Sequence, residues 1–433
     1  MAPDSLRTHV YPLCIFFLLF CNCNKAADPF RKVWVARENG KYILYRNGKP
    51  FVVRGGSGFT HMARLKAIGG NTIRTWDTVG LGAILDEAAA NNLAVIAGFY
   101  VPESKYLDYF YRNQAKVDSQ YTAFREIVRR YRSHPALLMW CLGNEVDFPF
   151  KARYNRFYDA YNGLLDMIHT EDPDHPITTT MVNYQFRNVM NIRLKVPGLD
   201  ILAFNTFGDL KHLQRNLTSF SWLWNGPFLV TEWGIFSPQE SKCTAWGVPI
   251  EPTSTVKAGL YREFYTKDLP VDNPRFLGSL TFYWGEKQEV TPTWYSIIGE
   301  NGAATAMVGE MQALWTGVAP MYKAPELEYM LVNGKKAADN ILMQPGTSQS
   351  ADIKLKMSAA KGLRIVWKVL DEDFDPHSND LPVERKVDII PADSFKVRFR
   401  APTKEGPYRL YSWIYDAYGN VATANTPFYV VGQ

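Results

Sequence analysis

The chain has 433 residues, of which 46% are hydrophobic and 21% are charged, and its formal net charge is +5 at pH 7. This composition excludes a disordered protein and a protein with many membrane spans, and the chain has no run of five like charges that would indicate a nucleic-acid surface. At roughly 100 to 200 residues per domain, the length predicts two or three domains.

Residues 1–23 are typical of an export leader. The apolar run Leu13–Cys21 resembles a signal-peptide core, and it is much shorter than the roughly 20 residues that span a bilayer as a helix. Two interpretations remain open: a cleaved secretory leader, or a lipoprotein leader in which a lipid on Cys21 or Cys23 anchors the protein to a membrane. The bulky Phe20 departs from the small residue usual before a lipidated cysteine. Both interpretations predict an extracytoplasmic protein, either secreted or anchored as a lipoprotein.

The next segments predict a short N-terminal β-hairpin and then a (β/α)8 barrel. Alternating residues around Asn39-Gly40 predict the hairpin, because Asn-Gly favours a tight two-residue turn. From residue 51 onward, short apolar runs alternate with helical patterns, which is typical of repeated βα units. The eight runs are Phe51–Gly55, Asn71–Trp76, Leu93–Phe99, Leu137–Glu145, Pro176–Met181, Leu199–Asn205, Pro227–Glu232 and Ser279–Trp284. Residues 51–322 fit the roughly 250 residues of a TIM barrel.

Strand patterns alone follow the barrel, and they predict an immunoglobulin-like β-sandwich over residues 325–433, near the roughly 100 residues of such a domain. The predicted strands are Ile353–Met357, Leu363–Leu370, Lys386–Ile390, Phe395–Phe399, Tyr408–Tyr415 and Phe428–Val431. The expected fold class is therefore α/β: a leader, a catalytic TIM barrel with its hairpin over residues 24–322, and a C-terminal β-sandwich.

Two carboxylates fall at the ends of predicted barrel strands. The fourth run ends in Asn144-Glu145, and the seventh ends in Glu232. Catalytic groups of such barrels stand at the C-terminal ends of the strands, where the βα loops converge. A pair of carboxylates at one barrel mouth is what glycoside hydrolysis requires.

Four motifs resemble those of retaining glycosidases built on (β/α)8 barrels, and the nearest likeness is to the TIM-barrel domains of glycoside hydrolase family 2. They are IGGNTIRTWD at 68–77, LMWCLGNE at 138–145, FLVTEWG at 228–234 and SLTFYWG at 279–285. The resemblance implies double displacement on a β-linked oligo- or polysaccharide without a cofactor. It assigns the general acid/base to Glu145 and the nucleophile to Glu232. It also places Arg74, Asn144 and Asn205 at the substrate site, with Asn144 on the sugar 2-hydroxyl.

The same resemblance predicts opposite electrostatic environments for the two carboxylates. Arg74 is expected to keep Glu232 ionised, since a neighbouring cation lowers a carboxyl pKa. Burial is expected to raise the pKa of Glu145, so that it is protonated when substrate binds. One departure stands out, because many relatives have Asn-x-Tyr where this chain has Asn205-Thr206-Phe207. The lost charge-assisted hydrogen bond costs about 1.5 to 3 kcal/mol, unless Tyr283 or Tyr184 replaces the missing donor.

Aromatic residues make up 14% of the chain, and some are expected to stack on sugar rings. The resemblance makes Trp284, at the end of the eighth run, the main stacking residue. Trp246 and Trp294 in the last two barrel loops are further candidates, whereas Trp76 and Trp140 are assigned to the barrel core. Glu286 and Glu289, also in the last loop, either contact substrate hydroxyls or are solvated.

The remaining patterns support no other chemistry. The histidines form neither HExxH nor a Cys/His cluster, so no metal is expected. Only Cys141 and Cys243 lie beyond the leader, which excludes a disulfide scaffold. The sequence therefore predicts an exported retaining glycoside hydrolase with a carbohydrate partner and no cofactor. The alternatives are a transglycosylase that uses the same intermediate, and a carbohydrate-binding barrel with little activity.

Overall fold

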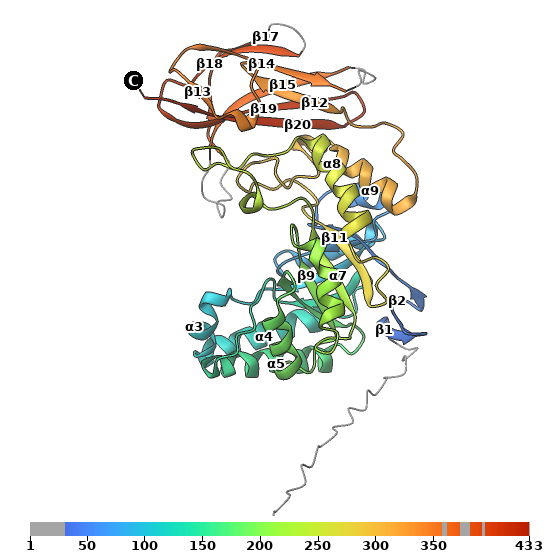
Figure 1. Ribbon diagram of the computed structural model, residues 1–433. Coiled ribbons are helices and arrows are strands. Elements are labelled where there is room, and N and C mark those ends of the chain that lie inside the picture. Colours follow the sequence, from blue (N-terminus) through green and yellow to red (C-terminus); the bar gives the residue numbers. More distant parts are fainter. Residues whose placement is uncertain (1–30, 357–361, 373–381, 392–394, 433) are drawn as a thin grey trace, which may run out of the picture.

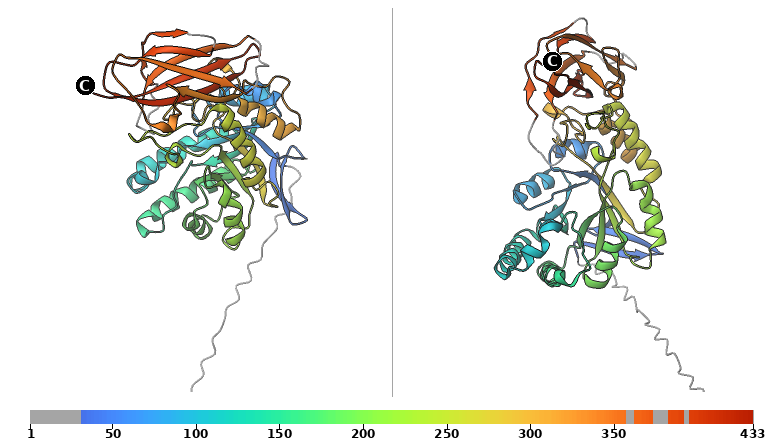
Figure 2. Two further views of the ribbon diagram at one scale, coloured as in Figure 1. Left: turned by 45° about the horizontal axis from the view of Figure 1, so that its top comes forward. Right: turned by 60° about the vertical axis from the view of Figure 1, so that its left-hand side comes forward.

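The computed structural model describes residues 31–356, 362–372, 382–391 and 395–432 (Figure 1). The predicted leader over residues 1–23 lies outside these residues. Two bodies are visible, a barrel of strands and helices and a β-sandwich packed on it (Figures 1 and 2). Within the described residues, no helix is both long and apolar enough to span a membrane.

The barrel is a closed ring of eight parallel strands, which confirms the predicted fold class. In chain order the strands are β4 (Val53–Ser57), β5 (Thr72–Arg74), β6 (Ala94–Phe99), β7 (Leu137–Leu142), β8 (Ile177–Val182), β9 (Ile201–Asn205), β10 (Phe228–Trp233) and β11 (Phe276–Thr281). The α-helices are α1 (Met62–Ala67), α2 (Leu81–Ala90), α3 (Leu107–Tyr111), α4 (Gln114–Tyr131), α5 (Asn155–Glu171), α6 (Phe186–Lys195), α7 (Leu210–Ser219), α8 (Ser254–Glu263) and α9 (Ala306–Thr316).

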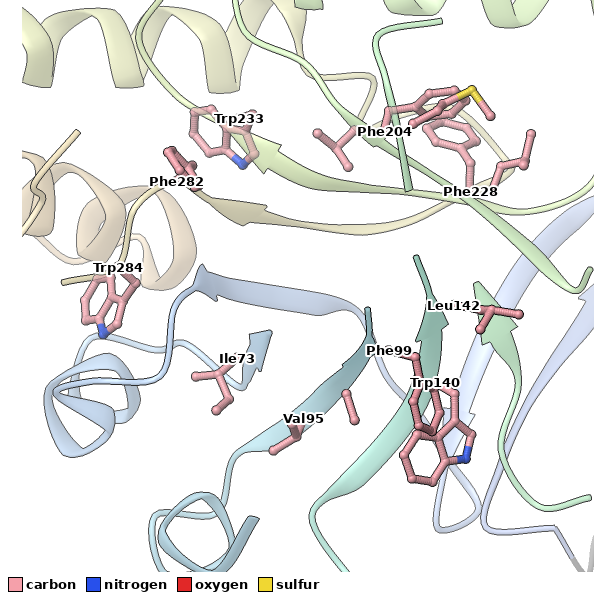
Figure 3. Packing of buried hydrophobic residues seen from close by; sticks show 14 of the residues in the cluster. Ile73, Val95, Phe99, Trp140, Leu142, Phe204, Phe228, Trp233, Phe282 and Trp284 are labelled. Carbon is pink, nitrogen blue, oxygen red and sulfur yellow. The ribbon is translucent and has the colours of Figure 1, made fainter. Parts of the chain in front are cut away.

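The barrel strands are buried on both faces, which explains their nearly continuous apolar sequences. Every residue of β7 and β9 is buried, as expected for parallel strands with side chains inside the barrel and helices outside. The large core between strands and helices includes Trp140, Phe204 and Phe228 (Figure 3). A smaller core, which includes Leu138 and Ile201, fills the barrel itself.

The N-terminal hairpin forms as predicted and closes one end of the barrel. Its strands are β1 (Val33–Glu38), β2 (Lys41–Arg46) and the short β3 (Lys49–Pro50). Asn39 and Gly40 form the turn with positive φ angles of 49° and 81°, the conformation that Asn-Gly adopts at little cost. Val33 and Leu44 join the core inside the barrel.

The C-terminal body consists of two packed sheets around a second core, as predicted for a β-sandwich. One sheet contains β12 (Leu327–Val332), β14 (Ser348–Leu355), β18 (Lys396–Arg400) and β17 (Ile389–Pro391). The other contains β13 (Ile341–Met343), β20 (Val421–Val430), β19 (Gly406–Tyr415), β15 (Arg364–Asp371) and β16 (Glu384–Arg385). The patterns missed β12, β13 and β16, and Met357 at the end of one predicted strand lies outside the described residues.

The eighth barrel strand differs from its prediction in a way that matters for the site. It begins at Phe276 and ends at Thr281, three residues earlier than the predicted run. Gly278 weakens the strand signal in the sequence. The structure requires this glycine, since a Cβ there would lie 2.2 Å from the carbonyl oxygen of Val53. The segment after Thr281 is therefore a loop over the barrel mouth.

Candidate active site

Glu232 lies near the end of β10, and its side chain is almost completely buried at the barrel mouth. Its Oε1 accepts a hydrogen bond from Nη1 of Arg74 at 2.5 Å, and a second from Nε1 of Trp76 at 2.8 Å. Arg74 is the last residue of β5, and its side chain is fully buried. Both bonds fall on one oxygen, so Oε2 is the carboxylate oxygen left to face a ligand.

Glu145 follows β7 on a sharply turning backbone, with positive φ angles at Gly143 (88°) and Glu145 (54°). A left-handed glutamate is uncommon, and such backbone conformations cluster at functional sites. Its Oε1 accepts a hydrogen bond from Nδ2 of Asn205 at 2.9 Å. Asn205 also donates to Oδ1 of Asn144, which accepts from Nη2 of Arg74 at 2.6 Å. A continuous hydrogen-bonded chain thus links the two carboxylates.

Both carboxylates line one pocket of about 490 Å³. The lining residues are Phe59, Trp76, Asn144, Glu145, Phe207, Glu232, Phe282, Tyr283, Lys287, Glu289 and Tyr295. The structure therefore brings together the two predicted carboxylates with Asn144 in the pocket wall, and it places Arg74 and Asn205 directly behind them.

The electrostatics of Glu232 and Glu145 differ from the prediction. Burial raises the pKa of Glu232 to about 7, and Glu145 adds to this rise, whereas the charge of Arg74 and the hydrogen bond from Trp76 oppose it. Arg74 lowers the pKa of Glu232 as expected, but removal from water outweighs the ion pair, so the net shift is upward. The expectation that Glu145 is buried is wrong, since this residue is exposed.

The three tryptophans predicted to stack on substrate do not line the pocket. Trp284 is fully buried against β4, where its backbone N–H donates to the Ser57 carbonyl (Figure 3). Its neighbour Gly56 has no room for a Cβ beside the Trp284 side chain. The prediction for Trp284 fails because β11 ends early, which brings Phe282 and Tyr283 to the pocket instead.

Trp294 and Trp246 are held elsewhere. Trp294 is fully buried, and its Nε1 donates to the carbonyl of Phe236. Trp246 packs against Tyr429 of the sandwich with ring centroids 5.9 Å apart. Both rings therefore stabilise loops, and neither forms part of the pocket wall.

Trp76 is the residue that the sequence analysis placed wrongly in the core. It is only partly buried, it lines the pocket, and its ring stacks on Tyr283 with centroids 5.7 Å apart. Its position two residues after Arg74 could have indicated a place in the pocket, because residues two apart on an extended chain point to the same side. Trp140, by contrast, is fully buried as predicted, with Nε1 donating to Asp172.

Trp76 also supplies Glu232 with a hydrogen bond, although position 207 carries no tyrosine hydroxyl. Phe207 lines the pocket and packs against Phe282 and Tyr295. Tyr184, one of the two predicted replacements, packs its ring on Phe204 outside the pocket wall. Among the described contacts of Glu232, the donors are Arg74 and the indole N–H of Trp76.

Phe59, Phe282 and Lys287 line the pocket but were not predicted from the sequence, because they come from loops whose course the sequence pattern does not reveal. In the described part of the chain, no group of three His, Cys, Asp or Glu side chains is arranged to hold a metal ion.

The fold and the site define a class. A (β/α)8 barrel with carboxylates at the ends of its fourth and seventh strands, in one aromatic-lined pocket, has the architecture of a glycosidase barrel. Residues 71–238 match the model of the glycosyl hydrolases family 2, TIM barrel domain. Over these residues, the barrel of this chain is therefore similar to the TIM barrel domain of that family.

Individual relatives agree with this family. A β-glucuronidase of Chlorocebus aethiops is 24% identical over 235 residues, which are 46% of this chain and 33% of that protein. A β-glucuronidase structure from Bifidobacterium dentium, complexed with coumarin-3-O-glucuronide, has a TM-score of 0.52 at 18% identity and covers 67% of this chain and 50% of that chain. A second structure, Bacteroides uniformis β-glucuronidase 2, has a TM-score of 0.50 at 16% identity and covers 92% of this chain and 48% of that chain.

This chain spans a third of the curated relative and about half of each of these solved chains. At these identities the structural likeness establishes the fold, while activity depends on the site itself.

Proposed function

We propose that this protein is an exported retaining glycoside hydrolase that cleaves β-linked oligo- or polysaccharides. The observation that carries the proposal is the shared pocket, in which Glu232 is held by Arg74 and Trp76 while Glu145 faces the same space. Export rests on the sequence of residues 1–23, which predicts a leader.

Glu232, which two donors hold by one oxygen, is assigned as the nucleophile, and Glu145, which lines the same pocket, as the general acid/base. Ionised Glu232 attacks the anomeric carbon through Oε2, while Glu145 gives its proton to the leaving oxygen. Glu145 then removes a proton from a water molecule, which displaces the sugar from Glu232. Arg74 and Trp76 hold Oε1 of Glu232 in place throughout.

Asn205 and Asn144 position the acid and the sugar. The Asn205 amide donates to Glu145 and so fixes its side chain above the pocket. Asn144 is held by Arg74 and Asn205, and its side chain is the candidate partner of the sugar 2-hydroxyl. Hydrogen bonds to that hydroxyl strengthen as positive charge develops on the sugar ring.

The alternative of an inactive sugar-binding barrel rested on the absent hydroxyl at Phe207. Because Trp76 supplies a hydrogen bond to the Glu232 carboxylate, the absent hydroxyl is a weaker argument for an inactive barrel. A transglycosylase would share the glycosyl-enzyme intermediate, and it differs only in passing the sugar to a carbohydrate acceptor rather than to water.

The test is intact-mass spectrometry of the mature protein after incubation with a panel of 2-deoxy-2-fluoro glycosides, which trap the intermediate. We expect an adduct of one fluorosugar that peptide mapping places on Glu232, and no adduct with Glu232→Gln. Glu286→Gln, outside the pocket wall, is the matched control and should be labelled like wild type. Undiminished turnover by Glu232→Gln would overturn the proposal. Product analysis at high acceptor concentration separates hydrolysis from transglycosylation.

A further inference from the structure

Lys287 and Glu289 form an ion pair in the wall of the catalytic pocket. The ammonium nitrogen of Lys287 lies 3.3 Å from a carboxylate oxygen of Glu289, and about a quarter of each side chain is exposed. The two residues belong to the loop after β11. They therefore reach the pocket through this loop and not from the end of a barrel strand.

The backbone holds this pair in a defined position. Ser296 bridges the loop, because its Oγ accepts from the Lys287 N–H at 2.9 Å and donates to the Lys287 carbonyl at 3.3 Å. The backbone of Glu289 is paired with that of Thr291. A donor and an acceptor are thus presented together, which suits a sugar hydroxyl because a hydroxyl both accepts and donates.

The charge balance of the pocket is negative. Among the described lining residues, three carry carboxyl groups, namely Glu145, Glu232 and Glu289, and one carries a cationic side chain, Lys287. Arg74 adds no accessible cation, because it is fully buried and bonded to Glu232 and Asn144. With Arg74 counted, three carboxylates stand against two cations when all groups are ionised, so the site carries one net negative charge.

The carboxylates of the pocket also act on the phenol of Tyr295. Its pKa is raised by burial and further by the nearby carboxylates of Glu289, Glu240 and Glu232. A further anion in this pocket, such as a sugar carboxylate, would be repelled by the same glutamate side chains. It would also have to compete with Glu289 for Lys287.

We propose, on the basis of the glycosidase function proposed above, that the Lys287–Glu289 pair binds hydroxyl groups of an uncharged glycone and that the pocket rejects uronic acids. This specificity differs from what the names of the β-glucuronidase relatives suggest for those proteins. The pair acts as a specificity determinant because Glu289 neutralises the cation that a sugar carboxylate would need.

The first experiment compares kcat/KM for 4-nitrophenyl β-D-glucoside, β-D-galactoside and β-D-mannoside with that for the β-D-glucuronide and β-D-galacturonide. We expect at least one neutral glycoside to exceed both uronides by on the order of 100-fold. Glu289→Gln keeps the shape of the side chain and removes its charge, and it should narrow this ratio roughly tenfold. The control Glu286→Gln, on the same loop but outside the pocket wall, should leave the ratio unchanged.

A uronide preferred by wild type, or a ratio unaffected by Glu289→Gln, would overturn the inference. If wild type hydrolyses none of these glycosides, a binding experiment tests the charge selection independently of catalysis. Calorimetric titration of wild type with methyl β-D-glucoside, galactoside, mannoside and glucuronide should then show tighter binding of a neutral sugar. Tighter binding of the glucuronide would refute the charge selection, whereas neutral binding without turnover or trapping would refute the hydrolase function alone.

Discussion

The indole N–H of Trp76 donates to Oε1 of Glu232 over 2.8 Å, the same oxygen that accepts from Arg74. The two donors approach from one short segment, since Trp76 lies two residues after the end of β5. The indole thus gives Glu232 a second side-chain donor, while Phe207, which has no hydroxyl, lines the same pocket.

Replacing Trp76 by phenylalanine should lower kcat about 10- to 100-fold. The estimate follows from the loss of a hydrogen bond to a charged group, worth about 1.5 to 3 kcal/mol. The acidic limb of the pH profile should also move to higher pH, because the indole stabilises the ionised carboxylate. Steady-state kinetics against pH measures both effects. The control is Trp140→Phe, which removes a buried indole that donates to Asp172 instead of Glu232. It should not shift the acidic limb of the pH profile.

A second change should partly restore that loss. Phe207 lines the same pocket, so Phe207→Tyr in the Trp76→Phe background introduces a hydroxyl where the family motif has one. We expect kcat to recover by roughly tenfold relative to Trp76→Phe alone, in keeping with about one neutral-to-charged hydrogen bond. The double-variant cycle is compared with Phe207→Tyr alone. Strict additivity of the two changes would contradict a shared role on Glu232.

The pH dependence of wild type should show an acidic limb near neutrality. Burial raises the pKa of Glu232 to about 7, so the carboxyl group holds its proton below that pH and cannot attack the sugar. As pH rises through about 7, the carboxylate forms and kcat/KM should increase. A profile of kcat/KM, which reports the free enzyme, measures this limb. A limb at the ordinary glutamate value near 4.5 would show that Arg74 outweighs burial in solution.

Loss of Glu145 should depend on the leaving group. Glu145→Gln removes the proton donor, so glycosides with poor leaving groups should lose about 10²- to 10⁴-fold in kcat/KM. Glycosides of acidic phenols need little protonation of the leaving oxygen, so they should retain most of their kcat/KM. A series of aryl glycosides of graded leaving-group pKa measures the difference. Asp147→Asn, two residues further along the chain, is the control and should leave the slope unaltered.

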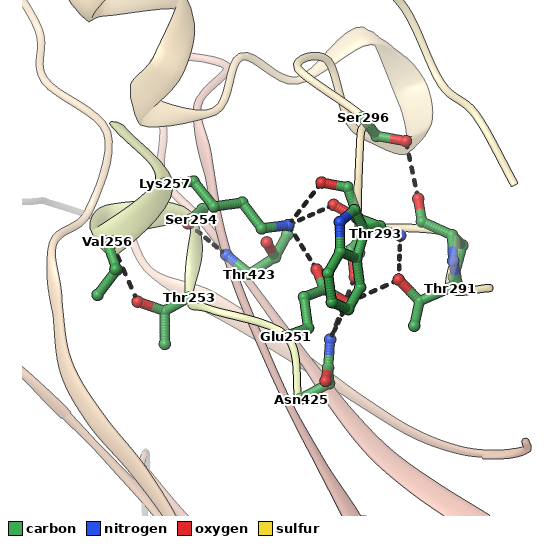
Figure 4. Close-up of polar contacts among 12 residues, drawn as sticks. Glu251, Thr253, Ser254, Val256, Lys257, Thr291, Thr293, Ser296, Thr423 and Asn425 are labelled. Carbon is green, nitrogen blue, oxygen red and sulfur yellow. Dashed lines mark hydrogen bonds and ion pairs between the residues drawn. The ribbon is translucent and has the colours of Figure 1, made fainter. Parts of the chain in front are cut away.

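The sandwich should stabilise the loop that completes the pocket. The buried ammonium of Lys257 donates to Glu251 and to the carbonyl groups of Thr293 and Trp294, directly before Tyr295 (Figure 4). Asn425 of β20 donates to the same Glu251 at 2.6 Å. The domain interface thus supports a wall of the site.

Lys257→Met should therefore destabilise the fold by about 3 to 5 kcal/mol, since it leaves the buried Glu251 carboxylate without its cation. Denaturant unfolding measures this free energy. Lys267→Met, which removes an exposed ion-pair partner of Glu263, should change it by about 1 kcal/mol at most. The pair Lys257→Met with Glu251→Leu should be less destabilised than Lys257→Met alone, because no charge remains unpaired.

The barrel, the hairpin, the sandwich and the positions of Glu145 and Glu232 at strand ends could be predicted from the sequence. Apolar periodicity and turn residues are local properties, and Glu145 and Glu232 follow directly from the strands that precede them. Arg74 was found in the same way, at the end of its own strand.

Which rings face the pocket, and how its charges balance, depends on contacts between segments that lie far apart in the sequence. Trp284 lies in the core, because β11 ends at Thr281 and the chain beyond it carries Trp284 against β4 rather than into the pocket. The raised pKa of Glu232 likewise depends on how completely the surrounding chain removes water, and Arg74 does not offset that loss. Burial and contact across the barrel arise from segments far apart in sequence, and no local pattern contains them.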